Sequence, residues 1–320
     1  MTQSLESAEV TVGSCKFDFF FRPNSIGDSG VIGQIFTQND YDITRFPLYK
    51  RFRRYIHRII TDGRKPLIID AGANIGASSL YFHAVYPESQ IIAVEPDIGN
   101  CDVFRVNCGG INNITLIEGG IASNDGLMAL EDPGLSDWGF RLVEPKDNSD
   151  KCVRVYSISS LLAEKSHEYC MPIIVKIDIE GGESELFKEY TTWLRNIPLL
   201  IIELHDWMLP GVASSRNFLR SISSFNFDFL YRGENVFCFN NDLLMSNNLD
   251  DTAEDLLTSI ASRDTEIHEL QQDVASRDTE IHELQQDVLA LRSDLDAIYC
   301  SRSWRIVSIV RRFRKILYQQ

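Results

Sequence analysis

Short apolar runs alternate with amphipathic stretches over the first two thirds of the chain. Five of these runs are rich in β-branched residues: Pro66–Asp70, Ile91–Glu95, Ile114–Glu118, Ile173–Asp178 and Leu199–Glu203. Continuous runs of this kind are typical of parallel strands that are buried on both faces. The stretches between them predict helices at Ala77–Val85, Asn100–Cys108 and Glu183–Leu194. The alternation predicts a doubly wound α/β sheet.

This first part of the chain ends in a different pattern. Phe227–Tyr231 and Asn235–Phe239 are separated by Arg-Gly-Glu, which predicts a tight antiparallel hairpin. A parallel sheet closed by such a hairpin resembles the Rossmann-like, seven-stranded class I methyltransferase fold more than a dehydrogenase. The last glycine is Gly233, and Asn240–Leu249 is polar. We therefore expect one α/β domain over residues 1–245.

The rest of the chain contains an identical tandem repeat. Ala261–Val274 recurs as Ala275–Val288, a period of two heptads. Apolar residues occupy one seam position at Ile260, Ile267, Val274, Ile281, Val288 and Leu295, and the other at Leu256, Leu270, Leu284, Leu291 and Ile298. This pattern predicts a long α-helical coiled coil over residues 250–300, with a homodimer as the first choice and a trimer as the second. A single solvated helix and a coil with a basic partner chain are the alternatives.

Residues 301–320 predict a basic amphipathic tail. They contain six basic residues and no acidic one, and Trp304 and Phe313 lie among their apolar positions. Such a helix suits the headgroups of an anionic membrane, so peripheral contact with the inner face of the plasma membrane is one expectation. A solvated basic end and a helix that docks on a protein are the alternatives.

The overall charge narrows the class of partner. The chain of 320 residues carries a formal net charge of −15, and nucleic acid repels an acidic surface. The cysteines form no CxxC pair, which argues against a disulfide framework or structural zinc. The N-terminus has no signal-peptide pattern, and no uncharged apolar run approaches the roughly 18 residues that span a bilayer. We expect a cytoplasmic protein that does not bind nucleic acid.

The loop after the first predicted strand carries the first chemical motif, Asp70-Ala-Gly72-Ala-Asn74-Ile-Gly76. Its two glycines allow a sharp turn and a close approach of the backbone to a ligand. The helix that follows offers unpaired N–H groups to an anion. Asn74 stands where the GxGxxG fingerprint has its second glycine. A purely structural turn is the alternative.

Glu95 ends the next predicted strand, 19 residues after Gly76. An acid at this position accepts hydrogen bonds from both hydroxyls of a ribose. NAD enzymes and methyltransferases share this device. Glu95 therefore indicates an adenosyl ligand and no particular reaction; an exposed acid at a strand end is the alternative.

Two later strands end in polar side chains, Asp178 and Glu180 on one and Glu203 and His205 on the other. Ligands of open α/β sheets bind beyond the carboxyl ends of the strands, so we expect these groups to converge near the reactive end of the cofactor. Asp178, Glu203 and His205 suit one divalent cation, Mg²⁺ or Mn²⁺. Alternatively, an acid or His205 is the general base for a hydroxyl, or His205 simply pairs with a neighbouring acid.

Together these motifs resemble the FkbM family of S-adenosylmethionine-dependent O-methyltransferases, from about Arg22 to Asn240. The shared stretches are DAGANIG, AVEP at Ala93–Pro96, KIDIEGGE at Lys176–Glu183, IIELH at Ile201–His205, and the upstream Asp28 and Tyr41. The resemblance implies that S-adenosylmethionine is held by Asp70, Gly72, Asn74, Gly76 and Glu95. It also implies that Asp178 and Glu180 lie beside the transferred methyl group.

The tail resembles another group of proteins. Ser301–Ile306 is similar to a segment that follows coiled coils in bacterial enzymes of surface-polysaccharide biosynthesis. We therefore expect an O-methyltransferase that acts on a sugar hydroxyl, in O-antigen or another surface polysaccharide. Its substrate would be a glycan, a nucleotide-sugar or a lipid-linked sugar, and glycosyltransferases would be its partners. A catalytically idle Rossmann scaffold on an oligomerising stalk and a nucleotide-dependent dehydrogenase are the rival hypotheses.

Overall fold

The computed structural model describes residues 4–131, 141–143, 152–166, 169–208, 210–245, 274, 276–277, 281–282, 284–298 and 302–317. Two compact units make up the chain, Met1–Ser246 and Asn247–Gln320.

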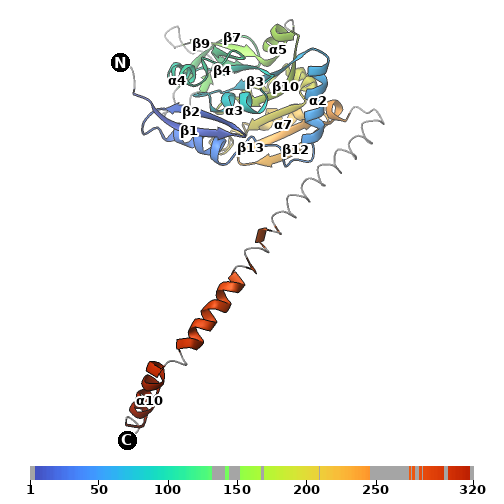
Figure 1. Ribbon diagram of the computed structural model, residues 1–320. Helices are drawn as coiled ribbons and strands as arrows, with labels where there is room; N and C mark the ends of the chain where they lie inside the picture. The colour runs from blue at the N-terminus through green and yellow to red at the C-terminus, as the bar shows by residue number, and fades with distance from the viewer. Residues whose placement is uncertain are drawn as a thin grey trace. The chain divides into compact units, whose positions relative to one another are not determined.

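A seven-stranded sheet forms the centre of the first unit, within its described residues (Figure 1). Its strand order is β12-β13-β11-β10-β3-β4-β5. The strands are β3 (Lys65–Ala71), β4 (Gln90–Glu95), β5 (Ile114–Glu118), β10 (Cys170–Ile177), β11 (Leu199–Glu203), β12 (Phe227–Arg232) and β13 (Asn235–Asn240). The five strands from β5 to β11 are parallel, whereas β13 is antiparallel to β11 and forms a hairpin with β12. This is the class I methyltransferase-like α/β fold with a mixed sheet that the sequence predicts.

Helices cover both faces of this sheet. In β3, Ile68 packs in one apolar layer, whereas Leu67 and Ile69 pack in the other, because successive side chains of a strand point to opposite faces. The first layer includes α2 (Tyr49–Thr61), α3 (Ala77–Val85) and α4 (Ile98–Cys108), and the second includes α5 (Ile158–Ser166), α6 (Glu183–Leu186) and α7 (Arg216–Ile222). The short helix α8 (Asn241–Leu244) follows the last strand. This double cover explains why the strands are continuous apolar runs.

Two smaller sheets were not predicted from the sequence. The strands β1 (Glu6–Val12) and β2 (Cys15–Phe21) form a hairpin, which precedes α1 (Ile26–Ile32) and a π-helical turn at Gly33–Thr37. A sheet of order β6-β9-β7-β8 lies between β5 and β10 in the chain; its strands are β6 (Gly120–Ala122), β7 (Gly126–Glu131), β8 (Arg141–Val143) and β9 (Cys152–Ser157). The N-terminal hairpin is tied to α4, because the Asn107 side chain accepts from the Phe20 N–H at 2.7 Å and donates to the Phe20 carbonyl at 2.9 Å.

The single helix predicted over Glu183–Leu194 is wrong. The helix α6 ends at Leu186, and a separate 3-10 helix follows at Thr191–Asn196. Tyr190 between them has a left-handed backbone with a φ of 58°, which cannot continue a right-handed helix. Phe187 and Trp193, on either side of the break, pack against each other with ring centroids 5.9 Å apart. The chain thus breaks the helix at a position where both aromatic rings are buried against each other.

The second unit is helical wherever the structure describes it. Helical residues are found at 281–282 and 284–298, and α10 spans Arg302–Leu317. Most of the tandem repeat lies outside the described residues, and so does the predicted seam from Leu256 to Leu270. The described seam residues from Ile281 to Ile298 are exposed to half or more of their surface. None of the described helices is long and apolar enough to cross a membrane.

Candidate functional site

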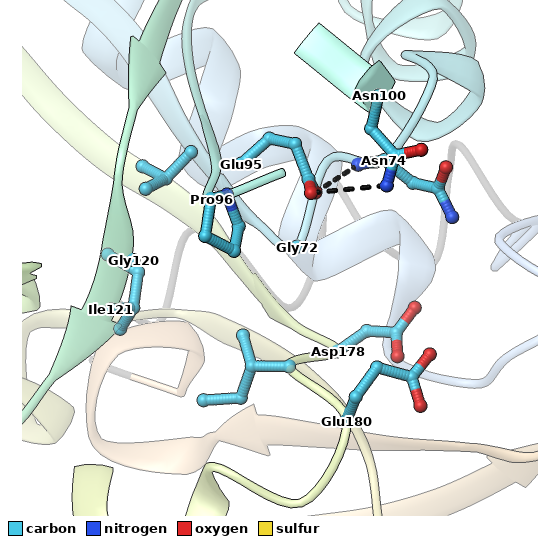
Figure 2. Close-up of a pocket in the computed structure, with 11 residues that line it drawn as sticks. Gly72, Asn74, Glu95, Pro96, Asn100, Gly120, Ile121, Asp178 and Glu180 are labelled. Atoms are coloured by element: carbon cyan, nitrogen blue, oxygen red, sulfur yellow. Dashed lines mark hydrogen bonds between the residues drawn. The ribbon is translucent and has the colours of Figure 1, made fainter. Parts of the chain in front are cut away.

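The carboxyl ends of four parallel strands meet at one edge of the sheet. Ala71 of β3 pairs with Val94 of β4 and with Ile177 of β10, and Ile177 pairs with Ile202 of β11, so these strands end level with one another. The loops that follow them enclose a cavity with about 560 Å³ of atom-free space, its open mouth included. Its lining consists of Gly72, Asn74, Val94, Glu95, Pro96, Asn100, Gly120, Ile121, Asp178, Ile179 and Glu180 (Figure 2).

Glu95, at the end of β4, is held in one position by three hydrogen bonds. Its Oε2 accepts from the backbone N–H of Asn74 at 2.8 Å, and its Oε1 accepts from the Asp97 N–H at 3.0 Å and from Asn100 Nδ2 at 3.2 Å. Figure 2 shows the side chain of Glu95 directed toward Asn74 and Asn100. Burial raises the pKa of Glu95 to about 7, although the three hydrogen bonds act to lower it. A fixed carboxylate of this kind suits the two hydroxyls of a ribose.

Asn74 gives the cavity a second acceptor. Its φ of 49° places it in the left-handed region, which asparagine tolerates better than most residues. Its Oδ1 is buried and has no hydrogen-bond partner among the described residues. A buried acceptor of this kind calls for a donor from a ligand or from water. The apolar side chains of Val94, Pro96 and Ile121 line the same cavity and suit the faces of a purine ring. The residues present therefore fit an adenosyl ligand.

At both glycines of the motif, another part of the protein occupies the space that a Cβ would need. Gly72 has a φ of +80°, and a Cβ added there would overlap the backbone carbonyl of Asp178. At Gly76, with a φ of +94°, a Cβ would lie 2.9 Å from Cys108 Sγ and 3.0 Å from a ring carbon of Phe104. Each glycine therefore allows a close approach between two parts of the protein, and the expectation that they also bring the backbone close to a ligand stays a prediction. Of the two, Gly72 also lines the cavity.

Asp70 is fully buried and is not among the cavity's lining residues. Its Oδ2 accepts hydrogen bonds from the hydroxyls of Ser78 and Ser79, each at 2.6 Å. Its Oδ1 lies 3.3 Å from Nζ of Lys176. Asp70 therefore supports the loop that carries Gly72 and Asn74. Any effect of Asp70 on a cofactor in that cavity would be exerted through this loop.

Lys176 is the buried cation of this loop system, with 2% of its side chain exposed. Its Nζ donates to the carbonyl of Gly72 at 2.7 Å and lies 3.3 Å from Asp178 Oδ2. Burial acts to lower the pKa of Lys176, but Tyr41, Asp178 and Asp70 together raise it well above its ordinary value. The ammonium group therefore joins the loop after β3 to the loop after β10.

His205, which follows β11, lies among four carboxylates. Its Nδ1 is 2.9 Å from Glu183 Oε1. Its Nε2 lies 3.6 Å from Asp178 Oδ1, 3.6 Å from Glu180 Oε2 and 3.5 Å from Glu203 Oε1. The structure thus brings together the predicted catalytic residues Asp178, Glu180 and His205. The predicted metal ligands Asp178, Glu203 and His205 offer atoms that all lie within 4.8 Å of one another.

The charges of this cluster shift the pKa of several members. Burial and the Asp178 carboxylate raise the pKa of Glu180 to about 8 and that of Glu203 to about 7. For His205, burial acts to lower the pKa, but the hydrogen bond with Glu183 and the charges of the nearby carboxylates outweigh it and raise the pKa to about 11. The carboxylates around the ring therefore favour its charged form.

Among the residues of the site that were not assigned from the sequence, three have polar or charged side chains: Asn100, Lys176 and Glu183. Lys176 and Glu183 did carry a signal, because a lysine inside a buried strand and an acid at the first turn of α6 both need partners. Asn100 depends on a tertiary contact. Arg22 Nη2 donates to Asn100 Oδ1 at 2.8 Å and to Asp28 Oδ1 at 2.6 Å, so the N-terminal segment helps to place Asn100 beside Glu95.

Comparison with known proteins gives three curated relatives. Methyltransferase sdnD of Sordaria araneosa is 32% identical over 100 residues, which cover 30% of this chain and 32% of sdnD. Methyltransferase 1 of Beauveria bassiana is 25% identical over 198 residues, covering 54% of this chain and 72% of that protein. The hexuronic acid methyltransferase AglP of Haloferax volcanii is 25% identical over 142 residues, covering 44% of this chain and 56% of AglP. The chain therefore spans about a third of sdnD and somewhat more than half of AglP.

The family match covers both the cavity and the four carboxylates around His205. A model of the methyltransferase FkbM domain matches residues 70–231, about half of the chain. This range begins at Asp70 on β3 and ends within the hairpin strand β12, so it contains Glu95, Asp178 and His205. The match over this region, together with the strand order of the sheet, shows that the chain belongs to the methyltransferase FkbM domain family.

Proposed function

We propose that this protein transfers a methyl group from S-adenosylmethionine to a hydroxyl oxygen of a sugar. The observation that carries the proposal is the cavity at the carboxyl edge of the sheet. It holds Glu95 and Asn74, which suit an adenosyl group, together with Asp178 and Glu180, which suit an incoming hydroxyl. The family of the chain, and the similarity to a hexuronic acid methyltransferase, support the same reaction and a sugar substrate.

Four polar residues of the cavity have a role in this proposal. Glu95 accepts hydrogen bonds from the ribose hydroxyls, and Asn74 Oδ1 accepts from a further donor of the ligand. Bound S-adenosylmethionine supplies an electrophilic methyl group on its sulfonium. Asp178 and Glu180 would accept a hydrogen bond from the substrate hydroxyl and orient its oxygen. One of these two carboxylates would take the hydroxyl proton as the oxygen bonds to the methyl carbon and the carbon–sulfur bond breaks. Orientation of this kind supplies most of the rate enhancement.

The cofactor assignment is tested by calorimetry with S-adenosylmethionine. We expect the wild-type chain to bind it, and Glu95→Ala to weaken binding by about 1–3 kcal/mol, because the ribose hydroxyls lose their acceptor. Glu118→Ala is the matched control. Glu118 ends the neighbouring strand β5, pairs with Arg105 and is 55% exposed outside the cavity. An equal affinity of the Glu95→Ala variant and the wild type would reject this cofactor site.

The substrate assignment is tested by transfer of a labelled methyl group to acceptor sugars. Sugars that carry a carboxylate and neutral sugars are offered separately, and the methylated product is analysed by mass spectrometry. Label on a sugar oxygen supports the proposal. Binding of S-adenosylmethionine without transfer to any acceptor glycan, nucleotide-sugar or lipid-linked sugar would favour the idle scaffold instead.

A further proposal concerns the second unit and the cellular context of this activity. We propose that residues 250–300 form an oligomeric coiled coil and that α10 binds an anionic membrane surface or a glycosyltransferase of polysaccharide assembly. The exposed residues of α10 include Arg305, Arg312 and Arg314 as well as Ile306 and Ile309, as an amphipathic basic helix requires. Co-sedimentation with anionic vesicles distinguishes the lipid partner from a protein partner.

A further inference from the structure

The imidazole of His205 and three carboxylates have the spacing of ligands around a single ion. His205 Nε2 lies 3.5–3.6 Å from one oxygen each of Asp178, Glu180 and Glu203. These separations are long for hydrogen bonds, which have a usual limit of about 3.2 Å. Two atoms that each bind a cation at about 2.1 Å lie roughly 3.0–3.5 Å apart when they subtend the angles of octahedral or tetrahedral coordination. The observed distances of 3.5–3.6 Å lie at or just above the upper end of this range, and one ligand atom each from Asp178, Glu203 and His205 lies within 4.8 Å of the others.

The other ring nitrogen of His205 is already fixed. Nδ1 lies 2.9 Å from Glu183 Oε1, and the side chains of both residues are 1% exposed. A histidine that binds a metal commonly donates its second N–H to a carboxylate, which sets the tautomer and the orientation of the ring. Glu183 therefore directs Nε2 toward the three other carboxylates.

Charge gives a third, independent observation. Lys176 lies near the cluster, but its Nζ is shared among Asp178, Asp70 and the carbonyl of Gly72. Glu180 has a left-handed backbone with a φ of 53°, and its Oε2 is buried without a hydrogen-bond partner among the described residues. A carboxylate oxygen in this state needs a proton or a cation.

We propose that Asp178, Glu203 and His205 bind one first-row divalent cation, with Glu180 as a fourth ligand and Glu183 as a positioning residue. A ligand set that combines imidazole with carboxylates favours Mn²⁺ over Mg²⁺, which prefers oxygen ligands and retains its water. This proposal rests on the proposed function only for its role: the cation would bind the substrate hydroxyl and make it easier to deprotonate.

The test is a titration of the metal-stripped full chain with Mn²⁺, in which the concentration of free Mn²⁺ is measured by electron paramagnetic resonance. We expect one bound ion per chain and an affinity at least about tenfold higher than that for Mg²⁺, measured by competition. His205→Ala and Asp178→Asn should abolish binding. Glu183→Gln should weaken it by about 10–100-fold, because the ring loses the carboxylate that orients it.

Glu185→Gln is the matched control. Glu185 also lies in α6, two residues after Glu183, but it accepts from Ser123 Oγ at 3.1 Å and pairs with Lys188. Its substitution should leave Mn²⁺ binding unchanged. S-adenosylmethionine binding is measured on every variant, both as a check of folding and as a separate readout. A wild-type chain that binds S-adenosylmethionine but no Mn²⁺ overturns the cation site and leaves the proposed function intact. Equal Mn²⁺ binding by His205→Ala also overturns the site.

Discussion

The chemistry of the candidate site depends first on how single carboxylates are held. Glu95 is 5% exposed, yet it keeps two backbone N–H groups and one amide as donors. Without these donors an ionised carboxylate in this position would be costly. Because burial still raises its pKa to about 7, we expect Glu95 to change charge in the physiological range.

This pKa leads to a prediction about cofactor binding. Ribose hydroxyls donate to the ionised form of Glu95, so a bound ligand lowers the pKa of Glu95 and binding below pH 7 must release a proton. Affinity for S-adenosylmethionine should therefore be highest above pH 7 and fall by up to about tenfold per pH unit below it. Calorimetry between pH 8 and pH 5.5 measures this slope.

Glu95→Gln is the control for this pH dependence. Any change of affinity that comes from titration of the ligand itself occurs equally in the variant and in the wild type. The variant should bind more weakly than the wild type at pH 8 and lack the additional loss at low pH. The same slope in both proteins would mean that Glu95 does not contact the ligand through its ionised carboxylate.

The positions of site residues could be predicted from the sequence where the residues lie at the ends of strands. Glu95, Asp178 and Glu203 were placed correctly at one edge, because each follows a buried apolar run and parallel strands end together. The roles of Asp70 and Gly72 were not predictable. Asp70 turns toward Ser78 and Ser79, and Gly72 meets the carbonyl of Asp178, 106 positions later in the chain. Such contacts exist only once β3 and β10 lie side by side.

At the scale of elements, continuous apolar runs predicted the central sheet well. Helices bury both faces of β3, β4, β10 and β11, so nearly every position in these strands is apolar. The strands of the smaller sheet follow no such rule. In β9 (Cys152–Ser157) only Val155 is buried, and β6 (Gly120–Ala122) has three residues, too few to show a period. Strands without a clear apolar pattern are recognised by their partners and not by their own sequence.

The contact between the loops after β3 and β10 gives a prediction at this scale. Gly72→Ala should lower the free energy of unfolding by about 3 kcal/mol or more, because it combines a strained positive φ with an overlap against the Asp178 carbonyl. The displaced loops should also weaken binding of S-adenosylmethionine. Urea unfolding, followed by tryptophan fluorescence, gives the first quantity and calorimetry gives the second.

Gly63→Ala separates strain from overlap. Gly63 has a φ of +73°, similar to that of Gly72, but a Cβ there would meet nothing within 4 Å. Its substitution should therefore cost only the backbone strain, about 1 kcal/mol. Equal losses of stability in the two variants would show that the Asp178 carbonyl does not constrain position 72.

At the scale of the whole molecule, the exposed apolar residues of the second unit are a candidate surface for a partner helix. Ile281, Leu284, Val288 and Leu291 are 51–67% exposed in the single chain. Regular apolar positions on one side of a long helix are the pattern by which two or more helices pack. Isoleucine or valine at one seam position with leucine at the other favours two parallel strands. Two seam arginines, Arg263 and Arg277, complicate this choice.

The last prediction concerns how the seam arginines affect assembly. Acidic residues flank the seam at Asp264, Glu266, Asp273, Asp278, Glu280 and Asp287. In a homo-oligomer these acids repel one another at a cost of tenths of a kcal/mol per pair, and the arginines can reach outward to neutralise them. Light scattering should therefore find a dimer for the full chain and a monomer for a chain truncated after Ser246. A trimer of the full chain would mean that the arginines fit a wider seam. A full-length monomer would favour a coil with a basic partner chain. An oligomeric truncated chain would show that the first unit assembles by itself.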